Sequence, residues 1–102
     1  MGIDVRLETE AGDEIETLLD FDDSLQKIVL ECDPTASVTL RFIDPYGNTA
    51  FNRLQMPCLI GEIESARERL RDEIAAKFAE EILRLALRCQ DEVNTYLKFY
   101  GG

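Results

Sequence analysis

The chain has 102 residues, of which 45% are apolar and 31% charged, which is typical of one globular domain over residues 1–102. Its 21 acidic and 11 basic residues give a net charge of −10, which repels nucleic-acid phosphates and anionic lipid surfaces. The sequence contains no histidine, so it lacks the commonest general base and every Ser–His or Cys–His pair. We therefore expect that the protein binds neither nucleic acid nor a membrane and is not an enzyme. We also expect it to have no catalytic residue, no metal site and no cofactor.

The N-terminus does not resemble an export signal, because Met1–Val5 is followed by acids rather than by an apolar run. No apolar stretch approaches the roughly 18 residues that a membrane-spanning helix needs. The three cysteines, Cys32, Cys58 and Cys89, form no C-x-x-C pair, which favours reduced thiols. These features predict a cytoplasmic protein.

The first elements follow from the spacing of apolar residues. Alternation predicts a strand over residues 3–8. Residues 14–21 mix helical spacing with many acids, so we expect them to be irregular. Asp22 or Asp23 is then predicted to cap a short helix, with Gln26 completing a capping box, until an Asp-Pro dipeptide ends it.

A hairpin is predicted over residues 38–54. Alternating apolar residues indicate strands at Val38–Ile43 and Thr49–Leu54, and Asp44–Asn48 between them is rich in turn-forming residues. Pro57 cannot donate a backbone hydrogen bond, so it ends the second strand and suits the first turn of a helix.

Helical spacing then continues over residues 57–90. A single helix of this length would extend about 51 Å, too long for a compact domain of this size. We therefore expect a break near Arg71–Asp72. The last residues, Thr95–Tyr100, alternate again and predict a closing strand.

The predicted order is β-α-β-β-α-β, which indicates the α+β class: a four-stranded antiparallel sheet with helices packed on one face, in the split βαβ, ferredoxin-like arrangement. The apolar positions predicted to face the helices are Ile3, Val5, Leu7, Val38, Leu40, Phe42, Phe51, Leu97 and Phe99. The positions predicted on the opposite, outer face are Arg6, Thr39, Arg41, Tyr96, Lys98 and Tyr100.

The acids gather near the N-terminus, where residues 1–24 hold nine acids against one base. Asp20, Asp22 and Asp23 are the densest of these and form the first candidate binding surface, suited to a basic partner. The same segment partly matches a calcium-binding loop. Leu25, however, occupies the position at which that loop requires glycine, so a solvated acidic loop is favoured.

Two further candidate binding surfaces follow from exposed aromatic, amide and basic groups, which are common at interfaces. The predicted hairpin contributes Tyr46, Asn48, Asn52, Arg53 and Gln55, which could equally hold the hairpin to the next helix. The predicted outer sheet face contributes Arg41, Tyr96, Lys98 and Tyr100, which would suit an anionic or aromatic small ligand.

Cys58 follows Pro57 at the start of a predicted helix, where the helix dipole can lower a thiol pKa. It has no histidine to act as its base, so a small buried hydrophobic role is favoured over a nucleophile. Cys32 and Cys89 occupy apolar positions and are predicted in the core.

The segment Phe42–Pro57, Phe-Ile-Asp-Pro-Tyr-Gly-Asn-Thr-Ala-Phe-Asn-Arg-Leu-Gln-Met-Pro, followed by an acidic helix and by Thr95–Phe99, resembles a family of short, acidic, uncharacterised bacterial proteins that share this hairpin motif. The resemblance covers most of the chain and implies no activity and no catalytic residue. Small domains of this kind often lie in mobile gene cassettes or beside toxin genes. The resemblance thus makes an inhibitor or immunity role conceivable.

The leading hypothesis is a non-enzymatic cytoplasmic protein-interaction domain, forming a homodimer, that acts as an inhibitor or immunity-type partner of a basic protein. The alternative is a small-ligand-binding domain with its pocket on the outer sheet face or at a dimer seam.

Overall fold

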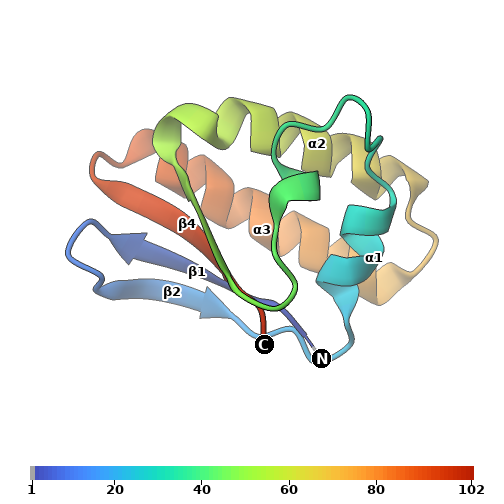
Figure 1. Ribbon diagram of the computed structural model, residues 1–102, viewed down its shortest axis with the longest axis horizontal. Helices are drawn as coiled ribbons and strands as arrows, with labels where there is room; N and C mark the ends of the chain where they lie inside the picture. Colours follow the sequence, from blue (N-terminus) through green and yellow to red (C-terminus); the bar gives the residue numbers. More distant parts are fainter. Residues whose placement is uncertain (1) are drawn as a thin grey trace.

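Residues 2–102 are described by the computed structural model of the protein. A hairpin of β1 (Asp4–Thr9) and β2 (Glu14–Leu18) leads into helix α1 (Ser24–Leu30). Strand β3 (Asn48–Asn52), helices α2 (Met56–Arg69) and α3 (Glu73–Asp91), and strand β4 (Thr95–Tyr100) complete the regular structure (Figure 1). Two short 3-10 turns, η1 (Leu40–Phe42) and η2 (Arg53–Gln55), precede β3 and α2.

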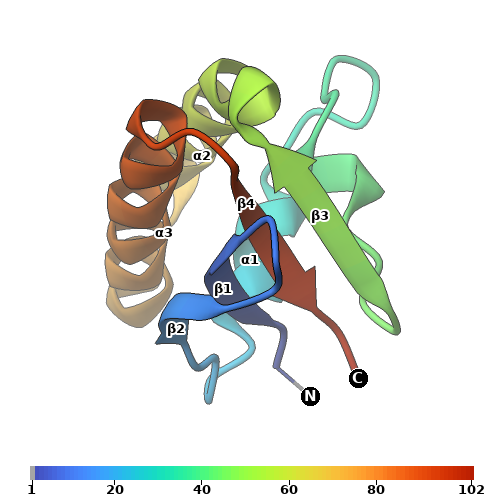
Figure 2. The same cartoon turned by 90° about the vertical axis from the view of Figure 1, so that its left-hand side faces the viewer.

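The four strands form one sheet in the order β2-β1-β4-β3, and every neighbouring pair is antiparallel. The helices pack on one face of this sheet, and the other face is left open (Figure 2). The predicted α+β class and four-stranded antiparallel sheet are therefore confirmed. The ferredoxin-like order is wrong, because the chain runs β-β-α-β-α-α-β.

Residues 14–18 are not irregular, since Glu14–Leu18 form the edge strand β2, whereas residues 19–21 lie in the loop that follows, as predicted. Pairing with β1 decides its structure: Gly12, with a φ of 91°, allows the tight turn, and Leu18 then lies opposite Val5. Glu16 faces the helices, where its carboxylate accepts hydrogen bonds from the Arg84 guanidinium of α3. The acids that obscured the strand pattern therefore belong to the edge strand itself, and one of them, Glu16, links it to α3.

The predicted strand at residues 38–43 is also wrong, because its backbone donors are bound elsewhere. The Glu62 carboxylate of α2 accepts hydrogen bonds from the backbone N–H groups of Val38, Thr39 and Leu40, at 2.9–3.1 Å. The chain curls into η1 instead. Leu40 is buried as predicted, whereas Val38 and Phe42 are each 56% exposed, and Thr39 is buried rather than on an outer sheet face.

The long helical segment does break where predicted. Helix α2 ends at Arg69, and the Asp72 carboxylate caps α3 by accepting hydrogen bonds from the N–H groups of Ile74 and Ala75. The predicted cap of α1 is wrong, because Asp23 has a left-handed conformation and makes no side-chain cap bond.

The core lies between the sheet and the helices. Of the positions predicted to face the helices, all except Val38 and Phe42 are buried. The Phe51 and Phe99 rings meet edge to face, with centroids 5.8 Å apart. The buried helix residues that complete this core include Leu25, Ile28, Leu59, Ile63, Ile82 and Leu85.

Candidate functional site

The loop between β2 and α1, Leu19–Asp23, holds one buried acid. The Asp20 carboxylate accepts hydrogen bonds from the N–H groups of Ser24 and Leu25, at 2.8 and 3.0 Å. The Asp20 N–H in turn donates to the Asp4 carboxylate at 3.1 Å. Gly2 passes so close that a Cβ there would lie 1.8 Å from the Asp20 carbonyl oxygen. This loop, which we call the aromatic–acidic loop, is therefore fixed at its base.

The tip of the aromatic–acidic loop presents an aromatic ring to solvent. Phe21 is 84% exposed, and Asp22 and Asp23 beside it are also exposed. The loop and the start of α3 line a shallow hollow of about 230 Å³. Its apolar lining comes from Leu19, Phe21, Ile74 and Phe78, and its charged rim from Asp22, Lys77 and Glu81. The structure thus combines an apolar anchor with acids where the sequence indicated only acids.

The three predicted acids therefore do not act alike. Asp20 is buried and holds the backbone, so it is unsuited to contact a partner. Asp22 and Asp23 are exposed at the surface. Phe21 was missed by the sequence analysis, although a large aromatic residue between three acids is itself a signal of an exposed anchor.

The residues predicted on a hairpin lie on and around β3. Tyr46 is 84% exposed in the turn before the strand, and Arg53 is exposed just after it. Asn52 and Gln55 form a capping box around η2, in which the Asn52 side chain accepts from two N–H groups and the Gln55 side chain accepts from the Asn52 N–H. Asn52 and Gln55 therefore have a structural role, as the alternative interpretation held.

The open face of the sheet carries Tyr96, Lys98 and Tyr100 of β4, as predicted. Asn48 and Asn52 of β3 lie opposite Tyr100 and Tyr96. Arg41 does not join them, because it belongs to η1, where its guanidinium stacks 4.5 Å from the Phe42 ring centroid.

Glu8 is the residue that the sequence analysis missed on this face, although its alternation with Leu7 would have placed it there. It is only 2% exposed. Its carboxylate accepts a hydrogen bond from the Tyr100 hydroxyl, lies 3.0 Å from Lys98 Nζ, and lies 3.0 Å from Arg6 Nε. Both cations of this face are thus already paired, which leaves little net positive charge for an anionic ligand.

The stability of this cluster depends on pH. Burial raises the pKa of Glu8. The hydrogen bonds from Tyr100 and Lys98, together with the charges of Lys98 and Arg6, lower it by more than burial raises it, so the pKa ends below the usual 4.5. A depressed carboxyl pKa contributes stability above about pH 4.5 that is lost as the pH falls through the folded-state pKa.

We therefore expect the Glu8→Gln variant to be less stable than the wild type at pH 7 and closer to it at pH 3. Urea unfolding at the two pH values measures this difference. A stability gap that stays constant between them would show that the Glu8 charge contributes nothing.

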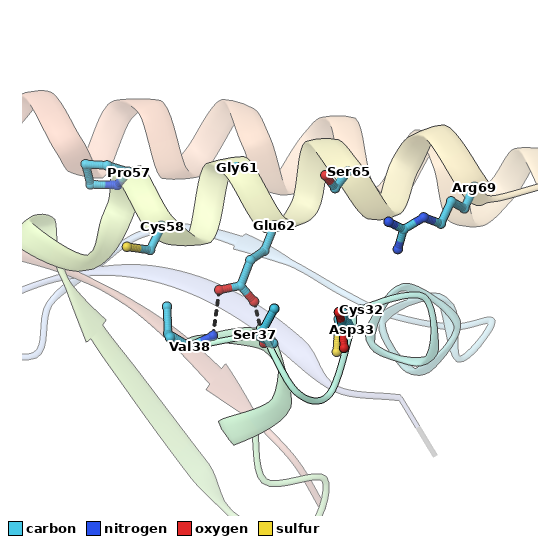
Figure 3. A pocket seen from close by; sticks show the side chains of 11 residues that line it. Cys32, Asp33, Ser37, Val38, Pro57, Cys58, Gly61, Glu62, Ser65 and Arg69 are labelled. Atoms are coloured by element: carbon cyan, nitrogen blue, oxygen red, sulfur yellow. Dashed lines mark hydrogen bonds between the residues drawn. The ribbon is translucent and has the colours of Figure 1, made fainter.

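A groove of about 470 Å³ runs between α2 and the segment at residues 32–38 (Figure 3). Glu62 points from α2 across it and accepts a hydrogen bond from the Ser37 hydroxyl, so its carboxylate is occupied. Burial raises the pKa of Glu62, but the hydrogen bonds from Ser37 and from backbone N–H groups bring it below its usual value. Cys58, Gly61, Ser65 and Arg69 line the α2 side, and Cys32 and Asp33 line the other.

Cys58 is exposed in this groove, so its predicted burial is wrong, and Cys32 is only partly buried. Cys89 is buried as predicted, and burial raises the pKa of its thiol. A raised pKa favours the unreactive protonated thiol.

Gly61 leaves the wall of the groove open, because an added Cβ would meet no atom within 4 Å. Glycine inside a helix costs about 0.5–1 kcal/mol relative to alanine. We expect Gly61→Ala to raise the free energy of unfolding by that amount in urea denaturation. Gly12→Ala is the matched control and should lower it, because the φ of 91° at Gly12 disfavours a side chain. A loss of stability in Gly61→Ala would contradict an open groove.

Among residues 2–102, no cluster of three or more acidic or cysteine side chains is placed to hold a metal ion. Within the same part of the chain, none of the helices is both long enough and apolar enough to span a membrane. Comparisons with protein-family models, with curated proteins and with solved structures gave no match. The resemblance to a family of acidic bacterial proteins therefore stays a prediction.

Proposed function

We propose that the protein is a non-enzymatic, cytoplasmic interaction domain that forms a homodimer and binds a basic protein through the aromatic–acidic loop. The observation that carries the proposal is the position of Phe21. A ring that is 84% exposed beside an apolar hollow is unfavourable in water and is the type of group that anchors protein interfaces.

The rigidity of the loop supports this role. Asp20 fixes its base because its carboxylate accepts hydrogen bonds from the Ile3 N–H, just before β1, and from the Ser24 N–H at the start of α1. Backbone that is already held in place loses less conformational entropy when a partner binds. The backbone that carries Phe21 is thus fixed before a partner binds.

The charge of the surface supports a basic partner. Six of the basic residues form ion pairs with carboxylates of the chain itself, namely Arg6, Lys27, Arg67, Arg84, Arg88 and Lys98. The net charge of −10 leaves acids in excess, and the exposed Asp22 places part of that excess next to the anchor. Such a field accelerates association with a cationic protein. The more specific version of this proposal is that the basic partner is a toxin, which the protein inhibits.

The test is affinity capture from lysate of the native host with the wild type and with the triple variant Phe21→Ser, Asp22→Asn, Asp23→Asn. We expect basic proteins that the wild type retains at low salt to be lost from the triple variant and released at high salt. With the captured protein purified, association should slow at least tenfold in the triple variant.

The control is Glu64→Gln with Glu68→Gln, which removes two exposed acids from α2. It should capture the same proteins as the wild type. Equal capture by the triple variant, or retention of acidic proteins only, would reject the loop as the binding surface.

A small-ligand-binding domain is the second candidate, and the groove along α2 favours it. Its volume of about 470 Å³ falls in the range of small-molecule sites, which span about 300–1,000 Å³. A thermal-shift screen with metabolites should then stabilise the wild type but not Gly61→Leu, which fills the groove. Absence of any stabilisation of the wild type would count against this candidate.

A further inference from the structure

Strand β3 lies at one edge of the sheet, and the direction of its backbone groups can be worked out. Gly101 N donates to Gly47 O at 2.7 Å, just beyond the β3–β4 pair. Residues that exchange hydrogen bonds alternate along an antiparallel ladder, so the backbone groups of Thr49 and Phe51 point to β4. Those of Asn48, Ala50 and Asn52 therefore point away from β4.

Two other hydrogen bonds agree with this assignment. Glu10 N donates to Asn94 O at 2.8 Å, just beyond the β1–β4 pair. By the same alternation, the backbone groups of the even-numbered residues of β4 point to β1, and those of the odd-numbered residues point to β3. The Asn52 N–H donates outward, to Gln55 Oε1 at 2.9 Å. The backbone N–H and C=O of Ala50 thus face the open edge.

The sequence of β3 lacks the usual protection of an edge. Natural edge strands carry charges, proline or bulges that prevent pairing with other chains. Strand β2, at the opposite edge, contains Glu14 and Glu16, and its pairing with β1 includes a register shift. Strand β3 reads Asn-Thr-Ala-Phe-Asn and pairs with β4 in unbroken register. In a chain with 31% charged residues, an uncharged and regular edge indicates a strand that pairs.

We infer that β3 pairs antiparallel with β3 of a second copy of this chain, about a two-fold axis at Ala50. In this register the two Ala50 residues exchange two hydrogen bonds. Each Asn48 N–H donates to the Asn52 carbonyl of the other copy, which adds two more. The two sheets become continuous, and both unprotected edges are covered.

Charge favours a second copy as the occupant of this edge. Two chains of charge −10 repel each other in general, but β3 brings no charge to the contact. The two-fold axis also places the exposed Arg53 at one end of β3 beside the turn of the other copy that contains Asp44 and Tyr46. A cation thus meets a carboxylate and an exposed ring at both ends of the interface.

This inference locates the homodimer of the proposed function on a surface separate from the aromatic–acidic loop. The experiment measures molar mass by analytical ultracentrifugation at about 0.1 mM protein, where we expect twice 11.6 kDa for the wild type. Ala50→Glu should weaken the dimer at least tenfold, because it puts two carboxylates at the axis. Within one copy the new carboxylate faces Lys98 across the strand pair, so the fold should tolerate it. Ala50→Val, which adds no charge, is the control and should stay dimeric.

Hydrogen exchange of the Ala50 amide gives a second measurement that needs no variant. The amide should be protected at high concentration and should lose protection on dilution, as the dimer dissociates. A monomeric wild type, or an Ala50 amide that exchanges freely in the dimer, would overturn the inference. A dimer that Ala50→Glu leaves intact would overturn the β3 interface while leaving dimerisation itself in place. If the wild type dimerised through β3 but captured no basic partner, the proposed role of the aromatic–acidic loop would be contradicted and the β3 interface would not.

Discussion

Replacement of Glu62 by alanine is expected to lower the free energy of unfolding by about 2–4 kcal/mol, as measured by urea denaturation. Its carboxylate accepts hydrogen bonds from the N–H groups of Val38, Thr39 and Leu40 and from the Ser37 hydroxyl. Loss of the acceptor leaves partly buried donors unpaired, at about 1–3 kcal/mol for each one that water cannot reach. Val38 is exposed, so water can replace the carboxylate as the acceptor for its N–H. The total loss of stability therefore stays below the sum of the costs of four unpaired donors.

Two variants separate this effect from a general loss of charge. Glu64→Ala removes an exposed carboxylate two residues further along α2 and should change stability by less than about 0.5 kcal/mol. Glu62→Gln keeps one acceptor oxygen and should lie between the alanine variant and the wild type. If Glu62→Ala and Glu64→Ala were equally stable, the carboxylate would not be what holds residues 37–40 on α2.

The same hydrogen bonds explain why part of the fold could not be predicted from the sequence. Residues 38–43 alternate in polarity as a strand does, and nothing local contradicts that pattern. What overrides it is a carboxylate at residue 62, more than twenty residues away along the chain. A pattern of side chains predicts which face is apolar, but it does not reveal which group takes the backbone donors.

The opposite error, at residues 14–18, has a related cause. Strand β2 is an edge strand whose acids point to solvent or to α3, so its alternation is weak. The segment becomes a strand because it pairs with β1, and not because of its own side-chain pattern. The helix break and most of the core were predictable because they follow from local causes: the length limit on a helix, the cap at Asp72 and the period of the apolar residues.

The candidate surfaces were predictable in outline only. The sequence singled out the acidic segment and the residues around β3, and both remain the surfaces on which the proposals rest. It could not distinguish Asp20 from Asp22, because two aspartates in one acidic run have the same local signature. Nor could it show that Asn52 and Gln55 bind each other, or that Ala50 lies at an open edge, since these depend on the pairing of β3 with β4.

The two aspartates therefore provide the second large prediction, in which stability and binding separate. Asp20→Ala is expected to lower the free energy of unfolding by about 2–3 kcal/mol, because the buried carboxylate accepts from the Ser24 and Leu25 N–H groups and so caps α1. Asp22→Ala, at an exposed position, should change it by less than about 0.5 kcal/mol. Urea denaturation of both variants at pH 7 measures the difference.

Partner binding should show the reverse order. Asp22→Ala removes an exposed charge beside Phe21 and should slow association with a basic partner, with an effect that disappears at high salt. Asp20→Asn keeps one acceptor oxygen for α1 while removing the charge, and in its folded form it should associate at close to the wild-type rate, because its carboxylate never reaches the surface. If Asp20→Asn slowed association as much as Asp22→Ala, the charge of the whole segment rather than its exposed tip would steer the partner. The anchoring role of the aromatic–acidic loop would then have to be tested through Phe21→Ser alone.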